Sequence, residues 1–234
     1  MINVYKADSR NGSNHGWLKT YHSFSFANYY DPDNVKFGSM RVLNDDIVQP
    51  ETGFGTHPHR EMEIVSIVLR GKLEHQDSTG TTQIIKRGEI QRMSAGTGVV
   101  HSEMNPSSTE YVNFLQIWFE PNERLLQPSY EQIAYNEESM KNTLLPVVSN
   151  QSLPEKIAYI HQDLTIYLSE LEADKSLQYT QEPNRRMFLF VIEGDLTVNE
   201  DFALKRRDSV RITDVTNLNL QTVSGTQFLL IDLY

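Results

Sequence analysis

A segment with the pattern strand, glycine turn, strand occurs twice in this chain, and each copy is followed by a second matching segment. VLRGKL at residues 68–73 returns as VIEGDL at residues 191–196, an offset of 123 residues. IKRGEIQRM at residues 85–93 returns as LKRRDSVRI at residues 204–212, an offset of 119 residues. Two matches in the same order, with a shorter hairpin between them in the second copy, predict a duplicated β-barrel or β-sandwich.

The rest of the chain is also typical of an all-β protein. Short runs rich in Val, Ile, Phe, Tyr and Thr recur between Gly, Asn, Asp and Ser residues, whereas apolar residues with helical periodicity are scarce. The clearest expected strands are Ile64 to Leu69, Thr82 to Ile85, Tyr111 to Phe119, Met187 to Ile192, Val210 to Ile212 and Gln227 to Leu233.

The stretch at residues 121–154 separates the two copies and carries four of the nine prolines. We therefore expect an N-terminal β domain at residues 1–120, a connector at 121–154 with a short helix near residues 137–145, and a C-terminal β domain at 155–234.

Composition excludes several classes of function. With 21 Lys and Arg against 31 Asp and Glu, the net charge of −10 disfavours direct binding to nucleic acid or to an anionic membrane. The chain has no cysteine, which excludes disulfides, thiolate nucleophiles and cysteine-based zinc or iron–sulfur sites. Any metal must therefore be held by histidine and carboxylate.

The sequence also carries expectations about compartment and assembly. Its start, MINVYKADSR, has no basic segment followed by an apolar run, and no apolar stretch reaches the roughly 20 residues that cross a bilayer. We expect a cytoplasmic protein without membrane contact. Because no periodic exposed apolar face is evident, we also expect a monomer.

Two pairs of ligating residues give the clearest chemical signal. His57 and His59 lie in THPHRE, and His101 and Glu103 lie in GVVHSEM, each pair with i, i+2 spacing. Alternate residues of a strand project from the same face, so two such strands facing each other would bring three imidazoles and one carboxylate together. That set suits iron, nickel, copper, manganese or zinc and leaves coordination positions open. We predict a metal site at these four residues.

Other histidines admit simpler interpretations. His15 and His22 lie near aromatic residues, and we expect a surface or core-edge role for them rather than a pocket lining. We expect His75 and His161 to be structural or solvated. His57 and His59 could instead lie in an exposed loop that is stiffened by the proline between them. The second pair of ligating residues and the neighbouring glycines argue against this alternative.

The residues around the two pairs resemble the cupin superfamily and, within it, the pirin family. HPHREMEIVSIVLRG is similar to the pirin version of the first cupin motif, and AGTGVVHSEMN to the second. SFSF, PDNVKFGSMRVLNDDIVQP and LQIWFEPN also resemble pirin segments in the same order, so the similarity covers most of residues 15–130. The resemblance implies a bicupin of two antiparallel jelly-roll barrels with a few short helices, of which the second is degenerate.

The resemblance also implies a site and an activity. His57, His59, His101 and Glu103 match the metal ligands of pirins, whereas Glu63 stands at the place of the general cupin glutamate. Bacterial pirin-like quercetinases cleave flavonols such as quercetin with molecular oxygen and release carbon monoxide and a depside, so a small planar phenol and oxygen are the expected partners. We expect iron(II), with nickel, copper, cobalt, manganese and zinc as alternatives. Glu103 would ligate the ion and accept the substrate proton.

Two other functions stay open at this point. Some pirins resemble metal- and redox-dependent regulatory proteins, which bind a partner protein without turnover. The second alternative is a cupin enzyme that acts on another small phenol.

The repeat offsets predict which half carries the metal. They map His57 and His59 to Thr180 and Glu182, and His101 and Glu103 to Leu220 and Thr222. Because these residues cannot form an equivalent ligand set, we expect one metal site, in the N-terminal half.

Overall fold

The computed structural model describes residues 1–234, and its regular secondary structure is almost entirely β-strand. Its chain divides into two compact units. The N-terminal unit consists of Asn11–Tyr135 and Ala158–Gln162, and the C-terminal unit of Met1–Arg10, Asn136–Ile157 and Asp163–Tyr234. None of the helices has the length and apolarity that spanning a membrane requires.

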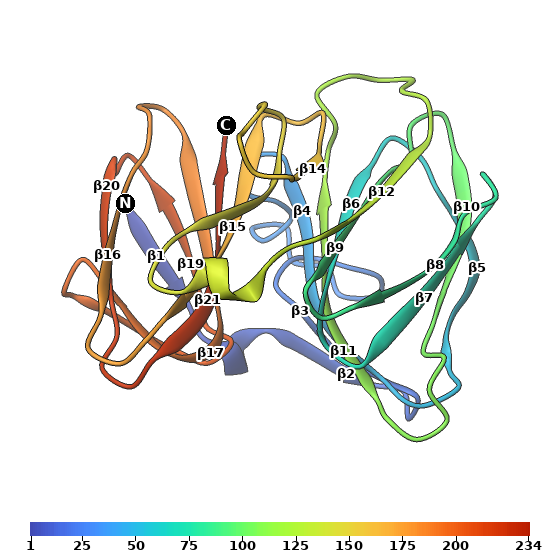
Figure 1. The fold of residues 1–234 in the computed structure, drawn as a ribbon, viewed down its shortest axis with the longest axis horizontal. Helices are drawn as coiled ribbons and strands as arrows, with labels where there is room; N and C mark the ends of the chain where they lie inside the picture. Colours follow the sequence, from blue (N-terminus) through green and yellow to red (C-terminus); the bar gives the residue numbers. More distant parts are fainter. The chain divides into compact units, whose positions relative to one another are not determined.

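The N-terminal unit is built from two antiparallel sheets, which Figure 1 shows in blue to green as two layers. The larger sheet has the order β12 (Ser129–Ala134), β9 (Glu89–Ser94), β6 (Glu63–Arg70), β11 (Val112–Phe119), β4 (Met40–Val48), β3 (Leu18–His22) and β2 (Asn11–Asn14). The smaller sheet has the order β5 (Gly53–His59), β10 (Val99–Met104), β7 (Lys72–Asp77) and β8 (Thr82–Lys86). The short strand β14 (Ala158–Tyr159) also belongs to this unit.

An apolar cluster joins the two sheets of this unit. Its buried members come from six strands of the two sheets and include Val68, Val112 and Phe114 on the larger sheet and Leu73 and Ile85 on the smaller. Burial of apolar surface, worth about 25 cal/mol per Å², is what holds such sheets face to face. The rest of the space between the sheets is lined by polar and aromatic side chains, described below.

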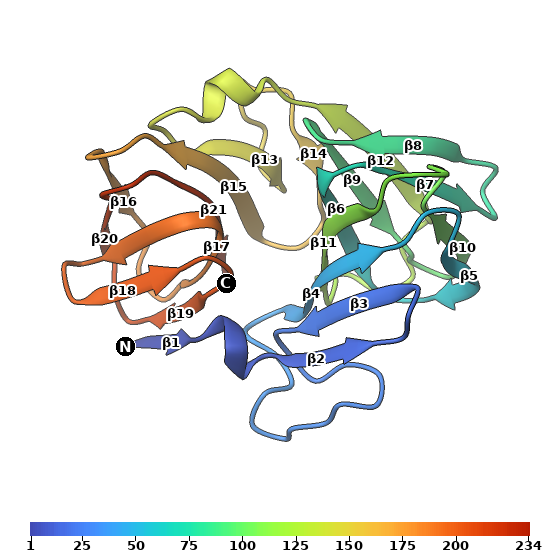
Figure 2. The same ribbon diagram turned by 90° about the horizontal axis from the view of Figure 1, so that it is seen from below.

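The C-terminal unit contains the second copy of the repeat. Its main sheet runs β1 (Ile2–Tyr5), β19 (Ser209–Thr213), β17 (Arg186–Val198), β21 (Thr226–Leu233), β15 (Leu164–Leu171) and β13 (Leu145–Ser149). The far end of β17 pairs with β18 (Phe202–Lys205) and β20 (Asn217–Gln221), and β20 pairs with β16 (Ser176–Thr180). Figure 2 shows β1, in dark blue, beside β19, so the first strand of the chain extends this unit's sheet.

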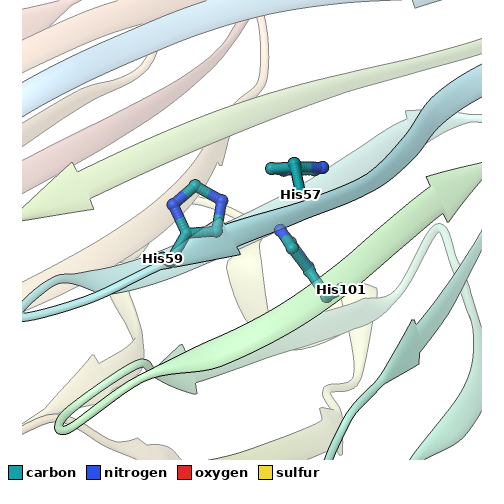
Figure 3. A group of neighbouring side chains, drawn as sticks. All are labelled: His57, His59 and His101. Atoms are coloured by element: carbon teal, nitrogen blue, oxygen red, sulfur yellow. The ribbon is translucent and has the colours of Figure 1, made fainter.

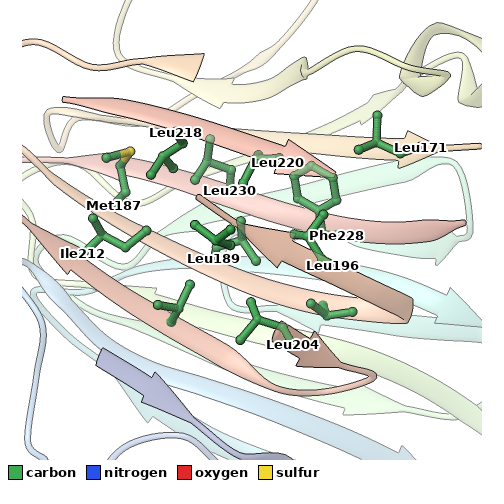
Figure 4. Close-up of a cluster of buried hydrophobic side chains, with 13 residues drawn as sticks. Leu171, Met187, Leu189, Leu196, Leu204, Ile212, Leu218, Leu220, Phe228 and Leu230 are labelled. Carbon is green, nitrogen blue, oxygen red and sulfur yellow. The ribbon is translucent and has the colours of Figure 1, made fainter. Parts of the chain in front are cut away.

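The C-terminal unit has a large apolar core. Figure 4 shows its cluster of buried side chains, among them Met187, Leu189, Leu220 and Phe228. Strands β15 and β17 to β21 contribute these side chains. The second copy therefore has the packing of a structural module.

Gly71 and Gly194 explain why the repeated motif needs its glycine. Gly71 joins β6 to β7 with φ of +78°, and Gly194 has φ of +83° where β17 leaves β21. A Cβ on Gly71 would lie 2.7 Å from the carbonyl oxygen of Tyr111, and one on Gly194 would collide with the carbonyl oxygen of Gly225. Only glycine fits both the positive φ and the close backbone approach.

The structure confirms the expected fold class, and all six expected strands are present as β6, β8, β11, β17, β19 and β21. The helix expected near residues 137–145 is shorter, a 3-10 helix η2 (Glu137–Met140), because the backbone is already extended at Lys141 and turns to a φ of +55° at Asn142. The other short helix is η1 (Ala7–Ser9). The domain boundaries expected from the sequence, 1–120, 121–154 and 155–234, remain a prediction about the duplicated modules. The compact units of the structure are divided differently, because Met1–Arg10 belongs to the C-terminal unit and the connector is split after Tyr135.

Candidate metal centre

Three histidines converge from two neighbouring strands of the smaller sheet, as Figure 3 shows. β5 carries His57 and His59 on one face, and β10 carries His101 directly opposite His57. The pairing shifts between His101 and Glu103, where β5 has an extra residue and so forms a bulge. The sequence predicts two strands that face each other. In the structure, the two strands are hydrogen-bonded neighbours in one sheet.

The imidazole rings are in mutual contact. Ring centroids are 4.9 Å apart for His57 and His59, 4.4 Å for His57 and His101, and 4.8 Å for His59 and His101. Ring nitrogens of all three lie within 4.8 Å of one another. A second group within the same limit joins His101 to Glu103 and His75. The four predicted ligands thus fall into two groups that share His101.

Hydrogen bonds select the nitrogen that two of these histidines present. His57 Nδ1 lies 2.7 Å from the carbonyl oxygen of Gly55, which can only accept, so Nδ1 carries the proton and Nε2 keeps its lone pair. His75 Nε2 lies 3.0 Å from the Asp77 carboxylate, and its Nδ1 lies 3.3 Å from His101 Nδ1. With His75 donating to Asp77, His101 donates from Nδ1 to His75, and its Nε2 keeps the lone pair.

Burial and neighbouring imidazoles favour the neutral forms of His59 and His101. Burial, assisted by His57, lowers the pKa of His59 from 6.5 to about 4. Burial, assisted by His57 and His59, lowers the pKa of His101 to about 2. Since metal ligands must be deprotonated, both side chains are ready to bind an ion at neutral pH without losing a proton.

His101 supplies the test of whether this group suits a metal. Its Nε2 atom is buried and has no hydrogen-bond partner in the protein. A buried polar atom of this kind normally finds a partner, and a lone pair beside two further imidazoles suits a divalent ion. The residues present therefore fit a metal ion.

Glu103 is held beside the histidines by a single amide. The side-chain nitrogen of Gln116 lies 2.9 Å from Glu103 Oε1 and 2.7 Å from Oε2, and the indole of Trp118 donates to Gln116 Oε1 over 3.2 Å. Burial raises the pKa of Glu103, and the Gln116 hydrogen bond offsets part of that shift. The carboxylate is thus oriented and more basic than an exposed one.

A cavity of about 440 Å³ opens beside the cluster. His57, His59 and Glu103 form part of its wall. Four aromatic side chains, Trp17, Phe26, Phe54 and Trp118, form another part and contact one another edge to face in two pairs. Its size and lining are those of a small-molecule site.

Asp46 on β4 is an ionisable group in the same wall. Burial raises the pKa of its carboxyl from 3.8 to about 7, the charges of Asp45 and Glu103 add to that effect, and the nearby Thr20 hydroxyl reduces it. The unfolded chain releases this proton near pH 3.8, whereas the folded chain keeps it until about pH 7. Between these values the folded state binds more protons, so this group destabilises the fold progressively as pH rises.

We therefore expect Asp46→Asn to stabilise the metal-free protein at pH 8 by roughly 4 kcal/mol, the free energy equivalent of that pKa difference. The gain should shrink steadily as pH falls toward 5, where wild type also holds the proton. Urea unfolding of both proteins in chelator at pH 5.5, 6.5, 7.5 and 8.5 measures the effect. A stability difference that is independent of pH would contradict it.

The structure locates three of the other histidines. His15 is exposed, as expected, His22 is buried, and both line the cavity. His75, expected to be structural or solvated, is fully buried and bonded to His101. The signal that could have found it is its i, i+2 spacing to Asp77, the same spacing as in the two recognised pairs.

His161 and Glu63 form a separate contact within the N-terminal unit. Glu63 is fully buried, and its carboxylate accepts from the His161 and Gln162 backbone amides, while His161 Nδ1 lies 2.9 Å from it. This carboxylate fastens residues 158–162 and belongs to neither histidine group.

The corresponding strands of the C-terminal unit carry different side chains. β16 pairs with β20 as β5 pairs with β10, but Thr180 lies opposite Asn217, and Leu220 belongs to the apolar cluster. Both groups of metal-ligating side chains in the structure lie in the N-terminal unit.

Comparison with known proteins agrees with this architecture. The pirin family model matches residues 4–119, and the model of the quercetinase C-terminal cupin domain matches residues 147–233. A quercetin 2,3-dioxygenase of Escherichia coli strain K12 is 42% identical over 234 residues, which cover 100% of this chain and 99% of that protein.

Two crystal structures of YhhW from Escherichia coli are also similar. One superposes with a TM-score of 0.95 at 40% identity, covering 100% of this chain and 98% of the other. The second, bacterial pirin YhhW in complex with nickel(II), has a TM-score of 0.94 at 40% identity and covers 100% and 99% of the two chains.

Proposed function

The chain belongs to the pirin family, and from this premise we propose that it is a metal-dependent dioxygenase that cleaves flavonols such as quercetin with molecular oxygen. The products would be carbon monoxide and a depside. A relative 42% identical over its whole length is named quercetin 2,3-dioxygenase, which supports an oxidoreductase of this kind. The small planar phenol and oxygen would be its partners.

One observation carries the proposal. A group of three imidazoles, including the unpartnered Nε2 of His101, lies beside a cavity with aromatic walls. A flavonol dioxygenase needs a group of metal-binding side chains next to a cavity that accepts a flat aromatic molecule.

We propose that His57, His59, His101 and Glu103 hold the ion, in the N-terminal domain alone. A divalent ion bound there supplies positive charge that favours the ionised form of a phenolic hydroxyl, together with open coordination positions. Iron(II) is our first choice, and the nickel complex of YhhW makes nickel the alternative to test beside it.

The remaining chemistry falls to side chains of the chain itself. Glu103, made more basic by burial, would accept the proton of the reacting hydroxyl at a carboxylate oxygen. Gln116 would keep that oxygen in place through its amide. The aromatic side chains of Phe54 and Trp118 would hold the flavonol rings and exclude water from the reacting carbon atoms.

The test is oxygen-dependent loss of quercetin absorbance, with carbon monoxide trapped from the headspace. Protein loaded with iron(II), protein loaded with nickel(II) and metal-free protein are compared. Turnover with carbon monoxide in a metal-loaded sample alone supports the proposal. Stoichiometric metal binding without turnover for any metal would contradict it and favour the regulatory function.

A further inference from the structure

The cavity contains a group of polar side chains that the proposed chemistry does not use. Thr20 and His22 on β3 and Asn44 and Asp46 on β4 all line it. Thr20 lies directly opposite Asp46, and His22 directly opposite Asn44, so the four side chains form a square on one face of the larger sheet. We call this square the polar recess.

Each member of the polar recess carries an unsatisfied polar atom. Thr20 Oγ1, His22 Nδ1, Asn44 Oδ1 and Asp46 Oδ1 are buried and make no well-formed hydrogen bond in the protein. The four residues are between 2% and 6% exposed. A buried polar atom without a partner destabilises the fold, and only Thr20 and Asp46, which lie opposite each other, offset part of that cost between themselves.

Nothing in the fold requires polar residues at these positions. Leu18 and Val48, one cross-strand pair further along the same two strands, lie in the apolar cluster of the unit. Apolar side chains would therefore extend that cluster at no loss of sheet pairing. The four polar side chains line the cavity together with Leu18 of the apolar cluster, which points to a role in binding what the cavity holds.

The chemistry of the recess identifies the group it would bind. Asn44 Oδ1 is an acceptor, and the Thr20 hydroxyl and the His22 ring each accept or donate. Aromatic side chains line the same cavity, among them Phe54 on the smaller sheet and Trp118 on the larger sheet, and they suit a flat ring. A ring that carries hydroxyl groups satisfies both surfaces at once.

We infer that the polar recess is a binding subsite for ring hydroxyl groups of the substrate, other than the hydroxyl that reaches the histidines. The substrate class is then a planar polyphenol, and the recess distinguishes it from the same skeleton without those hydroxyls. This inference rests on the proposed function, because it places a flavonol in the cavity.

The experiment combines changes in the protein with changes in the ligand. Thr20→Val removes the hydroxyl oxygen, Asn44→Leu removes the amide oxygen and nitrogen, and both substitutions nearly keep the side-chain volume. Binding to nickel-loaded protein without oxygen is measured by quenching of tryptophan fluorescence, since both tryptophans of the chain line the cavity. The ligands are quercetin, galangin, which lacks the hydroxyls of the pendant ring, and 3,3′,4′-trihydroxyflavone, which lacks those of the fused ring.

We expect each variant to bind quercetin about tenfold more weakly and to lose the preference for quercetin over one of the two other flavonols. The metal-free variants should also unfold at a temperature equal to or above that of wild type, because an unsatisfied atom has been removed. Ser169→Ala, which removes a buried unpartnered hydroxyl in the C-terminal unit, should share the gain in stability and leave binding unchanged.

Two failures can be told apart. Unchanged affinity and unchanged preference in both variants, with wild type binding quercetin, would overturn the subsite and leave the proposed function standing. A wild type that binds none of the three flavonols would overturn the proposed function and the substrate class together. Variants that lose both stability and affinity would show the recess to be structural, which also overturns the inference.

Discussion

Replacing His57 and His101 together by alanine is expected to reduce metal content from about one ion per chain to none. His101 contributes the buried Nε2 atom, and His57 lies opposite His101 on the paired strand. The two proposed ligands that remain, His59 and Glu103, are too few to hold the ion. Metal-free wild type should gain about 4 kcal/mol of unfolding free energy when free metal exceeds its Kd a thousandfold, and the double variant should gain nothing. Elemental analysis and thermal unfolding with and without metal measure both effects.

Glu182→Ala is the matched control for this variant. The repeat offset assigns Glu182 to the place of His59 in the second half, and its side chain is exposed. It should keep full metal content and the full gain in stability. Stoichiometric metal in the double histidine variant would mean that the ion is bound elsewhere.

His75→Phe is expected to weaken metal binding by about 10- to 100-fold without removing a predicted ligand. His75 accepts from His101 Nδ1 and so keeps the lone pair on His101 Nε2. Without that acceptor, His101 is free to carry its proton on Nε2, where it competes with the metal. Burial raises the pKa of Asp77, but hydrogen bonds from Thr79 and His75 outweigh it and hold the pKa below its ordinary value, so its carboxylate still fixes the His75 tautomer in wild type.

A positioning role can be separated from a packing role by three comparisons. His75→Gln keeps an acceptor for His101 and should lose less metal affinity than His75→Phe. Nitrogen chemical shifts of His101 in the metal-free protein should show the proton on Nδ1 in wild type and a growing share on Nε2 in His75→Phe. His161→Phe, which breaks the contact with Glu63, should lower stability without changing metal affinity. Equal affinities for wild type and His75→Phe would refute the role.

Several parts of the fold could be predicted because they depend on local sequence. The repeated glycine of VLRGKL and VIEGDL marks a change of sheet in both units, since a Cβ at Gly71 or Gly194 would meet a neighbouring backbone. The helix near residues 137–145 was overestimated, because a polar run with Asn142 in the left-handed region closes after one turn. Local composition does not report that conformation.

The candidate site was predictable in part for the same reason. The i, i+2 spacing puts His57 and His59 on one face of a strand wherever that strand lies, and only the register of β5 and β10 brings His101 opposite them.

The sequence determines which side chains share a face of a strand, where glycine is required and which half of the duplication keeps the candidate ligands. Only the tertiary structure determines which side chains become neighbours on adjacent strands. Pairing of β7 with β10 sets His75 opposite Glu103 and beside His101, and pairing of β3 with β4 assembles the polar recess. Such neighbours depend on strand register, which is decided by the packing of whole sheets and not by the few residues around each position.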